Sequence, residues 1–522
     1  MTGRLLTLNA GSSSLKFAVY EASPDLPLLL SGQVSGLPAA PRLKAKSDGE
    51  VIATEAWPAD LDLDAVVERT LDWLQTQPQG QGIAAVGHRI VHGGLKFRDA
   101  TALTPDVIQA LEALTPLAPL HQPFNLRAVA IASARLPDAL QVGVFDTGFH
   151  ADQPEIARLY ALPRELIADG VISYGFHGLS YDYIASALGD RAAGRAIVLH
   201  LGSGVSLCAL RDGKSIATTM GFSALAGPPM STRSGSLDPG IVLHLITAKG
   251  MSAEDVSDLL YNKSGLLGLS GLSGDMVTLL ASDAPAARQA LDVYVYRISR
   301  EIGSLAAALG GLDTLVFTAG VGENSPAIRA RIAALCAWLG VRLNEAANLA
   351  GAEQISAPDS PVKVLVIPTD EEIVIARGLT RLLPDHLSRR GEGGAQPAKR
   401  VGKVRGYGPG DEDPALQPPF IGAGADIRVL ETFDAIIERY RNEIQQLAER
   451  QYGYSKFGEF RISPLTADRA LVAATYKRFK KDGSLLEERA TTYLVVKVAG
   501  AWKIQGTFRQ DFKDFGRIFS LP

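Results

Sequence analysis

The stretch TLNAGSSSLKF, residues 7–17, overlaps the short apolar run RLLTL at residues 4–8 and is the starting point for interpreting the fold. An apolar strand that ends in Asn, Gly and three hydroxyl side chains can turn its backbone N–H groups toward an anion. Lys16 adds a positive charge just beyond the last serine. The G-x-x-x-x-G-K-S/T spacing of a Walker loop is absent. Taken alone, the stretch fits a phosphate-binding turn and a hairpin with a solvated lysine equally well.

A strand that ends in a small-residue turn occurs three times, which favours the phosphate-binding interpretation. The turns are LNAGSSS (8–14), LHLGSGVS (199–206) and FTAGVGENS (317–325), and each contains or follows an apolar run. Short apolar runs alternate with longer helical patterns up to about residue 385, which is typical of an α/β fold. Two similar α/β halves facing a shared cleft would bring the three turns together.

The composition is that of an ordinary globular protein and excludes several classes of function. The 522 residues are 46% hydrophobic and 21% charged, and this length predicts two to four domains. The net charge of −4 gives no general attraction to nucleic acid or to anionic membranes. Two cysteines, Cys208 and Cys336, make neither a disulfide framework nor a thiolate metal cluster. Without a signal-peptide pattern or an apolar run of ~20 residues, we expect a cytoplasmic protein with no nucleic-acid or membrane partner.

The chain changes character toward its C-terminal end. Residues 386–424 are rich in Gly, Pro and charged residues and lack periodicity, which is typical of a linker. From residue 425, apolar side chains at helical spacing predict a helix, and the strand-like runs RALVAATYKRF, ATTYLVVKV and AWKIQGTF follow. Residues 425–522 are therefore predicted to form a small α+β domain with a curved antiparallel sheet.

Charged side chains occur beside predicted strand ends and in glycine-rich turns. Taken singly, each has a structural explanation, since an arginine can belong to an ion pair and a carboxylate can cap a helix. Together, two arginines, a lysine, an Asp and a Glu suit a site for much negative charge and a divalent cation, as phosphoryl transfer requires. No GxSxG motif or cysteine nucleophile supports acyl transfer. The motifs are GHRIVHGG (87–94), VFDTGFH (144–150), YGFHGLS (174–180), MSTRSGSLDPG (230–240) and PTDEEIVIAR (368–377).

A series of collinear motifs resembles the acetate kinase family over roughly residues 1–385. The resemblance implies the two-domain actin-like ATPase fold, with a duplicated ribonuclease H-like βββαβα core. It implies lobes at 1–150 and 151–385, with the chain end at about 370–385 packing back on the first lobe. It also implies reversible phosphoryl transfer from ATP to acetate, giving ADP and acetyl phosphate, with Mg²⁺ or Mn²⁺ and usually in a homodimer. The motifs are NAGSSSLKF, VGHRIVHGG, LAPLHQP, VFDTGFH, YGFHG, MGFSALAG, TRSGSLDP, SGLLGLSG, VFTAGVGENS and IPTDEE.

The resemblance also implies a role for each matched position, in a direct in-line transfer without a phosphoenzyme. Arg89 and Arg233 would clamp the carboxylate and the transferring phosphoryl group. Asp146 would act as an active-site acid or organise the metal, and His177 would donate to the transition state. The other matched positions are Asn9 and Glu371 for the metal; Lys16, Ser12, Ser14, His200, Gly202, Ser203, Gly204, Asp275, Met276, Val277, Gly320, Gly322, Glu323 and Asn324 for the nucleotide; and Arg89, Val91, Leu120, Phe176 and Ala224 for the acyl pocket.

The sequence departs from the family pattern around the nucleotide and the catalytic histidine. Ser203 replaces the Asn of HLGNG, and Leu179 and Tyr181 replace the Thr and His of YGFHGTSH. The adenosine-pocket pattern S-x-DFR reads S-G-D-M-V here, so Met276 and Val277 replace an aromatic residue and an arginine.

The acyl pocket departs as well, because Ala224 replaces the proline of MGFTPLEG and leaves more room beside the acetate methyl group. Three alternatives to acetate kinase therefore stay open. They are a propionate or butyrate kinase, a kinase with another phosphoryl donor such as pyrophosphate, and a non-catalytic sensor of acetyl phosphate or nucleotide. The retained charged motifs argue against a sensor, since a decayed enzyme should have lost some of them.

The C-terminal unit resembles, less specifically, the cone-shaped α+β domains of the nuclear-transport-factor-two-like (SnoaL-like) class. Residues 425–522 contain no histidine, so no His–Asp pair is available there for catalysis. The resemblance predicts a binding or dimerising accessory domain.

Overall fold

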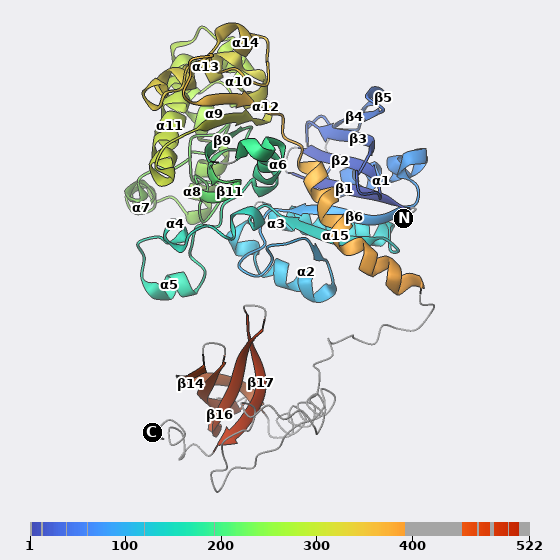
Figure 1. Cartoon of the computed structure of the whole chain (residues 1–522), viewed down its shortest axis with the longest axis vertical. Helices are drawn as coiled ribbons and strands as arrows, with labels where there is room; N and C mark the ends of the chain where they lie inside the picture. The colour runs from blue at the N-terminus through green and yellow to red at the C-terminus, as the bar shows by residue number, and fades with distance from the viewer. Residues whose placement is uncertain are drawn as a thin grey trace. The chain divides into compact units, whose positions relative to one another are not determined.

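The computed structural model describes residues 3–391, apart from 12–13, 38, 60, 120 and 193, together with four strands between residues 452 and 510 (Figure 1). The chain divides into two compact units, Met1–Ala395 and Gln396–Pro522. The helices are α1 (Leu63–Thr76), α2 (Pro105–Glu112), α3 (Gln122–Arg135), α4 (Glu155–Arg158), α5 (Arg164–Ala168), α6 (Gly178–Leu188), α7 (Pro239–Thr247), α8 (Ala253–Asn262), α9 (Gly265–Ser270), α10 (Met276–Leu280), α11 (Pro285–Leu309), α12 (Ala319–Asn324), α13 (Pro326–Leu335), α14 (Glu345–Leu349) and α15 (Glu371–Gly391).

The first sheet of the larger unit has eight strands in the order β5-β4-β3-β2-β1-β6-β8-β7. The central strand β1 pairs antiparallel with β2 and parallel with β6, and β6 pairs parallel with β8. Residues 7–10 of the TLNAGSSSLKF stretch therefore form the end of β1, and residues 14–17 form the start of β2. The strands are β1 (Arg4–Ala10), β2 (Ser14–Glu21), β3 (Leu28–Ser35), β4 (Arg42–Ser47), β5 (Glu50–Ala56), β6 (Ile83–Ile90), β7 (Thr101–Ala102) and β8 (Leu140–Phe145).

The second sheet repeats this arrangement with five strands in the order β11-β10-β9-β12-β13. Its central strand β9 pairs antiparallel with β10 and parallel with β12, and β12 pairs parallel with β13. The central strands β1 and β9 are buried except at their first residue because neighbouring elements cover both of their faces. The predicted α/β fold with a duplicated core is confirmed. The strands are β9 (Arg195–Leu201), β10 (Val205–Arg211), β11 (Lys214–Thr218), β12 (Thr314–Thr318) and β13 (Lys363–Val366).

Helix α15 returns from the second sheet to the first and packs against β1, β6 and β8 (Figure 1). Ala376 and Leu379 share an apolar cluster with Leu5 of β1. The helix lies so close that a Cβ atom at Gly87 would stand 2.4 Å from Ile375 Cγ2. It continues to Gly391, past the predicted start of the linker, and the linker from residue 392 lies outside the described residues.

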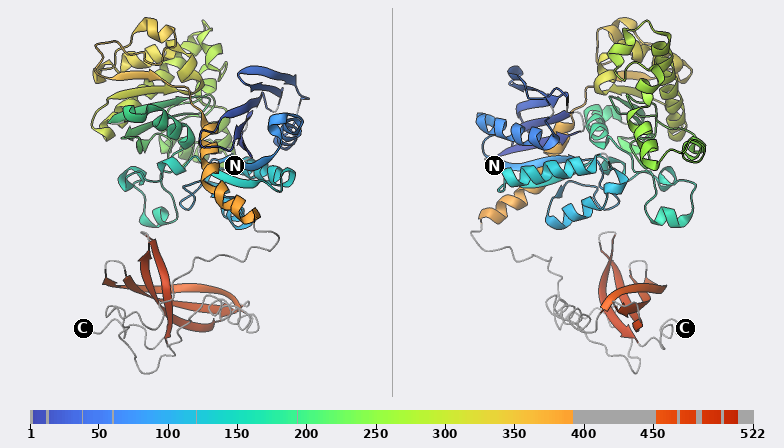
Figure 2. Two further views of the ribbon diagram at one scale, coloured as in Figure 1. Left: turned by 45° about the vertical axis from the view of Figure 1, so that its right-hand side comes forward. Right: turned by 180° about the vertical axis from the view of Figure 1, so that it is seen from behind.

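The smaller unit contains an antiparallel sheet in the order β14-β15-β16-β17 (Figure 2). Strands β15 to β17 correspond to the three predicted runs, whereas β14 was not predicted. Gly453, Gly458 and Pro464 interrupt its apolar pattern, and its pairing has register shifts. The predicted helix after residue 425 lies outside the described residues. The strands are β14 (Tyr452–Thr466), β15 (Arg469–Lys480), β16 (Leu485–Val498) and β17 (Ala501–Gln510).

Both cysteines, Cys208 and Cys336, are buried and unpaired. None of the helices in the described part of the chain is long and apolar enough to cross a membrane.

Candidate active site

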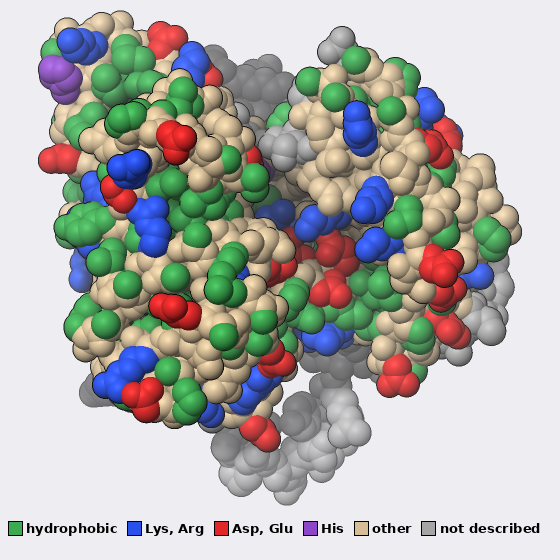
Figure 3. Space-filling model, turned by 90° about the horizontal axis from the view of Figure 1, so that it is seen from above, with side chains coloured by type: hydrophobic (Ala, Val, Ile, Leu, Met, Phe, Trp, Pro, Cys, Tyr) green, Lys and Arg blue, Asp and Glu red, His purple; other side chains and the backbone are tan. Residues whose placement is uncertain are grey.

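Polar side chains from both halves of the larger unit occur where the central strands end. Asn9 lies near the end of β1, Asp146 follows β8, and His200 lies near the end of β9. Seen from above, the molecule is hollowed between the two halves, and acidic and basic side chains gather in the hollow (Figure 3). This is the usual place for ligands in α/β folds, outside the carboxyl ends of the strands.

Arg89 and Asp146 form a paired unit on the first half. Arg89 Nε donates to Asp146 Oδ1 at 3.0 Å, and Arg89 Nη2 donates to Asp146 Oδ2 at 2.6 Å. The Asp146 side chain is 1% exposed and that of Arg89 18%. Burial alone would lower the pKa of Arg89, but Asp146 and Glu371 outweigh it and raise the pKa. Arg89 therefore stays charged at the edge of the hollow.

Asp146 is held from two sides. Burial raises the pKa of Asp146, while Arg89 and the backbone N–H of His177 oppose this by stabilising the carboxylate. The same carboxylate thus orients Arg89 and the start of α6. Close packing supports this arrangement, since a Cβ atom at Gly178 would lie 1.9 Å from the Asp146 carbonyl oxygen.

Asn9 joins the arginine to a pair of glutamates at the start of α15. Arg89 Nη1 donates to Asn9 Oδ1 at 3.1 Å, and Asn9 Nδ2 donates to Glu371 Oε2 at 2.9 Å and to Glu372 Oε1 at 3.4 Å. Burial would raise the pKa of Glu371, but Arg89, His200 and Lys16 together lower it. Glu371 is therefore an ionised carboxylate inside the cleft. Glu372 was not among the positions expected at the metal.

The oxygen atoms of Asn9, Glu371 and Glu372 fit a magnesium ion whose other ligands come from phosphates and water. Mg²⁺ in phosphoryl-transfer sites is bound by one or two carboxylates and substrate oxygens rather than by a full protein cage. The described residues contain no group of three or more His, Cys, Asp or Glu that would form such a cage. An ionised Glu371 with the oxygen atoms of Asn9 and Glu372 nearby matches a magnesium site built from one or two carboxylates and substrate oxygens.

His177 and His200 form a stacked pair in the cleft. Their ring centroids are 4.1 Å apart, with planes inclined by 20°. His177 has a left-handed backbone conformation (φ 57°, ψ 26°) at the N-cap of α6, a strain that persists mainly at functional sites. Burial, followed by His200 and Arg89, lowers the pKa of His177 well below its ordinary value. The imidazole is therefore neutral near pH 7.

Arg233 faces His177 across Gly204 in the turn between β9 and β10. A Cβ atom at Gly204 would lie 3.2 Å from His177 Nε2 and 3.7 Å from Arg233 Nη1. Glycine at this position therefore keeps open a small space that both polar side chains line.

Arg233 has no carboxylate partner among the described residues, unlike Arg89. Its Nη1 donates to the Ala224 carbonyl oxygen at 3.1 Å, and its Nη2 donates to His121 Nε2 at 3.3 Å. Burial lowers the pKa of His121 to about 3, with Arg233 and Arg89 adding to the effect, so His121 is a neutral acceptor. Burial also lowers the pKa of Arg233, as expected for a guanidinium that lacks a counter-charge. A bound anion would supply one.

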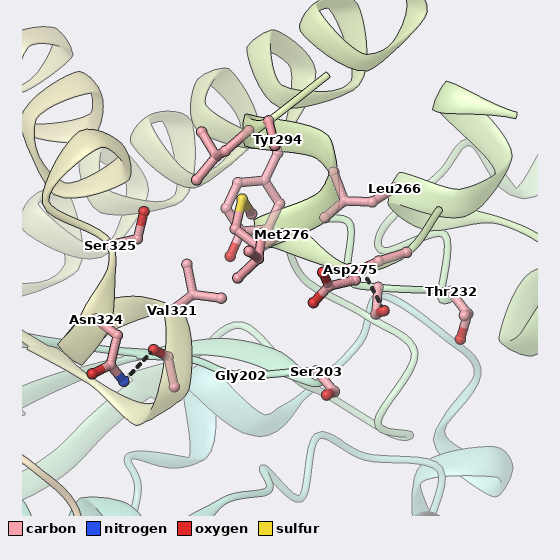
Figure 4. Close-up of a pocket in the computed structure, with 16 residues that line it drawn as sticks. Gly202, Ser203, Thr232, Leu266, Asp275, Met276, Tyr294, Val321, Asn324 and Ser325 are labelled. Carbon is pink, nitrogen blue, oxygen red and sulfur yellow. Dashed lines mark hydrogen bonds between the residues drawn. The ribbon is translucent and has the colours of Figure 1, made fainter. Parts of the chain in front are cut away.

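A cavity of about 790 Å³ lies in the second half beside the glycine turns (Figure 4). It brings together many positions expected at the nucleotide, from three separate segments of the chain. The structure does not place Lys16, Ser14, His200, Gly204, Gly322 or Glu323 in its lining. The expected positions that do line it are Gly202, Ser203, Asp275, Met276, Val277, Gly320 and Asn324.

Two of the remaining expected nucleotide positions contact the residues around Asn9 and Glu371 instead of the cavity. Lys16 is opposite Asn9 in the β1–β2 register and acts electrostatically on Glu371. Glu323 Oε1 accepts a hydrogen bond from the Thr369 backbone N–H at 3.1 Å, which ties α12 to the segment before Glu371. Ser12 lies outside the described residues.

Two lining residues that sequence reasoning missed are Tyr294 and Ser325. The Tyr294 hydroxyl and Ser325 Oγ are buried, and neither has a hydrogen-bond partner among the residues that the structure describes. Tyr294 reaches the cavity from α11, near Met276 (Figure 4). In the sequence, its helical spacing made it indistinguishable from an ordinary core residue. Unpartnered buried hydroxyls are rare. A polar ligand in the cavity would satisfy them if the lining shifts enough to let it reach them.

Three of the expected acyl-pocket positions share one apolar cluster, and one of them, Ala224, contacts Arg233. Val91 and Phe176 are buried in one apolar cluster, and Ala224 packs against it. Leu120 lies outside the described residues. His121, which the sequence left as a single histidine without a role, belongs to this region through its contact with Arg233.

Comparisons with known proteins agree with both resemblances. Residues 4–377 match the model of the Acetokinase family, and residues 417–511 match that of the NTF2-like protein (DUF6841). Acetate kinase from Rhodopseudomonas palustris (strain TIE-1) is 50% identical over 393 residues, covering 73% of this chain and 99% of that protein. The structure of Porphyromonas gingivalis acetate kinase is 37% identical with a TM-score of 0.64, covering 73% of this chain and all of that one. The structure of a propionate kinase from Francisella tularensis subsp. tularensis SCHU S4 is 32% identical with a TM-score of 0.67, covering 72% of this chain and 99% of that one. The chain belongs to the acetokinase family.

Proposed function

We propose that the protein is an acetate kinase, which transfers a phosphoryl group reversibly between ATP and acetate in one in-line step. The observation that carries this function is Arg233, a largely buried guanidinium without a carboxylate partner among the described residues, which faces His177 across Gly204. The paired Arg89 lies on the other half of the same cleft and acts electrostatically on both His177 and Arg233. Two fixed cations beside an apolar pocket suit an acyl carboxylate and a transferring phosphoryl group.

The side chains divide the work of the transfer as follows. Arg89, fixed by Asp146, would hold the acceptor carboxylate or an equatorial phosphoryl oxygen, and Arg233 would neutralise charge on the opposite side. His177, being neutral, would donate a hydrogen bond to the transferring group. Both reactants are thereby held in line, so orientation and charge neutralisation supply most of the rate enhancement.

Asn9 and Glu371, with Glu372 beside them, would hold the magnesium ion. When bound, the ion would neutralise charge on the nucleotide phosphates. The exposed Lys16, which lies opposite Asn9, would contact the same phosphates as a point charge.

The shape of the cavity supports a nucleotide as the phosphoryl donor. A volume of about 790 Å³ is within the usual range for small-molecule sites and far exceeds what pyrophosphate would need. Asp275 lines the cavity, but one of its oxygens caps α10 by accepting from the Thr278 backbone N–H at 2.8 Å. We assign the other carboxylate oxygen of Asp275 to a hydrogen bond with the ribose hydroxyls of the nucleotide.

Tyr294→Phe should weaken nucleotide binding by about three- to ten-fold, because one hydrogen bond to a buried hydroxyl is lost. The variant should be at least as stable as the wild type without nucleotide, since the hydroxyl has no partner in the described part of the chain. Titration calorimetry with ADP and thermal unfolding would measure both effects. Tyr296→Phe, on the exposed face of the same helix, is the matched control. Unchanged ADP affinity would show that the Tyr294 hydroxyl does not contact the nucleotide.

The proposed function is tested by an acyl-phosphate assay on the full chain. ATP, GTP and pyrophosphate would each be offered as donor, with acetate or propionate as acceptor. ATP-dependent acetyl phosphate is the expected product. Product with pyrophosphate alone would show that pyrophosphate, and not ATP, is the phosphoryl donor. No product with any pair of donor and acceptor would favour a non-catalytic sensor.

Propionate should be used nearly as well as acetate, with kcat/KM values within about ten-fold. Ala224 leaves space in the acyl pocket, and one methylene is worth only ~1–3 kcal/mol of discrimination. The similarity to a propionate kinase of known structure is consistent with this expectation. A strong preference for acetate in the same assay would contradict it.

We also propose a cytoplasmic homodimer in which the lobes meet near residue 150 and α15 belongs to the first lobe. Helix α7 supports self-association, because it has no buried residue although Ile241, Leu243 and Ile246 are large and apolar. The C-terminal unit is proposed as an accessory binding or dimerising domain. Light scattering on the full chain would establish the oligomeric state.

A further inference from the structure

Tyr181 is part of a short chain of hydrogen bonds that ends on His177. It occupies the position where the acetate kinase pattern has histidine, and its side chain is fully buried. The Tyr181 hydroxyl is 2.5 Å from Ser206 Oγ on β10. Ser206 Oγ is in turn 2.9 Å from His177 Nδ1. The chain therefore links the body of α6 to the imidazole at its N-cap through a neighbouring strand.

The direction of each hydrogen bond follows from the available acceptors. Within the described residues, Ser206 Oγ is the one hydrogen-bond partner of the Tyr181 hydroxyl, so the buried tyrosine proton must point at the serine. The serine proton then has one remaining partner, His177 Nδ1, which must accept it. A neutral imidazole that accepts at Nδ1 carries its proton on Nε2.

We propose that Tyr181 and Ser206 are positioning residues that hold His177 in the tautomer protonated at Nε2, with that N–H directed at the phosphoryl site. The Nε2 atom is the one that lies 3.2 Å from the Cβ position of Gly204, beside Arg233 Nη1. In the opposite tautomer a lone pair would face the phosphoryl oxygens and repel them. The two hydrogen bonds from Tyr181 through Ser206 to His177, called the relay below, thus make His177 a hydrogen-bond donor to the transferring group. The catalytic part of this proposal rests on the proposed kinase function.

A second set of contacts keeps the histidine ring in place without affecting its tautomer. His200, stacked on His177, is fixed by Ser180 Oγ, which lies 2.8 Å from His200 Nδ1. Ser180 Oγ also lies 2.9 Å from Thr369 Oγ1, close to Glu371 in the chain. Stacking fixes the plane of the His177 ring, and the relay decides which nitrogen carries the proton.

The tautomer can be measured directly on the full chain with ¹⁵N-labelled histidine. The sequence has eight histidines, and a His177→Gln variant assigns the signal of His177. We expect Nε2 to carry the proton in the wild type. Tyr181→Phe keeps the ring that packs against Phe149 and His150 but removes the relay donor, so a mixture of tautomers is expected. Ser206→Ala removes the hydroxyl that bonds His177 directly and serves if the first variant does not fold.

Kinetics provide the second measurement. Tyr181→Phe should lower kcat by about ten-fold with nearly unchanged KM values, because the lost interaction acts mainly in the transition state. Tyr174→Phe is the matched control: it removes a buried hydroxyl whose partner is the Gly170 carbonyl oxygen and should leave the His177 tautomer and kcat as they are.

The two measurements separate the relay from the kinase function. Protonation at Nδ1 in the wild type would overturn the relay, as would Tyr181→Phe with an unchanged tautomer and kcat. A tautomer that shifts while kcat stays constant would overturn the catalytic part of the proposal. If the tautomer shifts but the wild type makes no acyl phosphate, the relay stands and the proposed function fails.

Discussion

Arg89→Ala should lower kcat/KM for acetate by at least about 10³-fold and should also destabilise the protein. The activity loss follows from removal of a fixed cation beside the transferring charge. The stability loss follows from Asp146, which is 1% exposed and would remain buried without its bidentate partner. Removing one member of such a pair costs about 3–5 kcal/mol. The acyl-phosphate assay and urea unfolding, monitored by circular dichroism, would measure the two effects.

Two further variants separate activity from stability. Arg89→Ala combined with Asp146→Asn should regain part of the stability, because Asp146 is then uncharged while Glu371 still lacks the arginine, but should regain no activity. Arg98→Ala is the surface control, since Arg98 and its partner Asp152 are 50% and 94% exposed. It should change neither property measurably. Full stability of Arg89→Ala alone would show that water or another group compensates Asp146.

Arg233→Ala should lower kcat/KM by about 10²–10³-fold while leaving the free energy of unfolding nearly unchanged. Arg233 neutralises no carboxylate among the described residues; its partners are the Ala224 carbonyl oxygen and His121. Its removal therefore leaves no buried charge behind, and burial itself disfavours the charge that is removed. The same assay and unfolding experiment distinguish this pattern from that of Arg89.

Arg158→Ala is the matched control for this prediction. Arg158 is also partly buried and donates to carbonyl oxygens, those of Ala151 and Ser173, but it is not among the proposed site residues. It should retain kinase activity. A stability loss in Arg233→Ala as large as that in Arg89→Ala would mean that Arg233 has a structural role and would remove the main argument for an anion site.

The larger unit could be predicted in outline because its signals are local. Apolar runs such as residues 196–201 are strands buried on both faces, and each glycine-rich segment follows such a strand. The third of these segments forms helix α12 rather than the expected turn. In the smaller unit β14 was missed because glycines and a proline interrupt its apolar pattern, although pairing with β15 satisfies its backbone.

The candidate site was only partly predictable. Charged motifs identified Arg89, Asp146 and Arg233, because charged residues among apolar ones and glycines are conspicuous. Tyr294 looks like any core residue until its hydroxyl is found without a partner in the cavity. Ser206 looks like an ordinary strand residue until it is found between Tyr181 and His177.

The amino-acid sequence by itself determined the α/β class, the order of the glycine-rich segments and the family, because periodicity and contiguous motifs are properties of short segments. The tertiary structure alone decided which charges are paired and which are free. Arg89 has its carboxylate 57 positions along the chain and Asn9 has its glutamate 362 positions away, while Arg233 has none among the described residues. Such pairings depend on how the two sheets and α15 fold together, and the desolvation that gives them their energy exists only in the folded state.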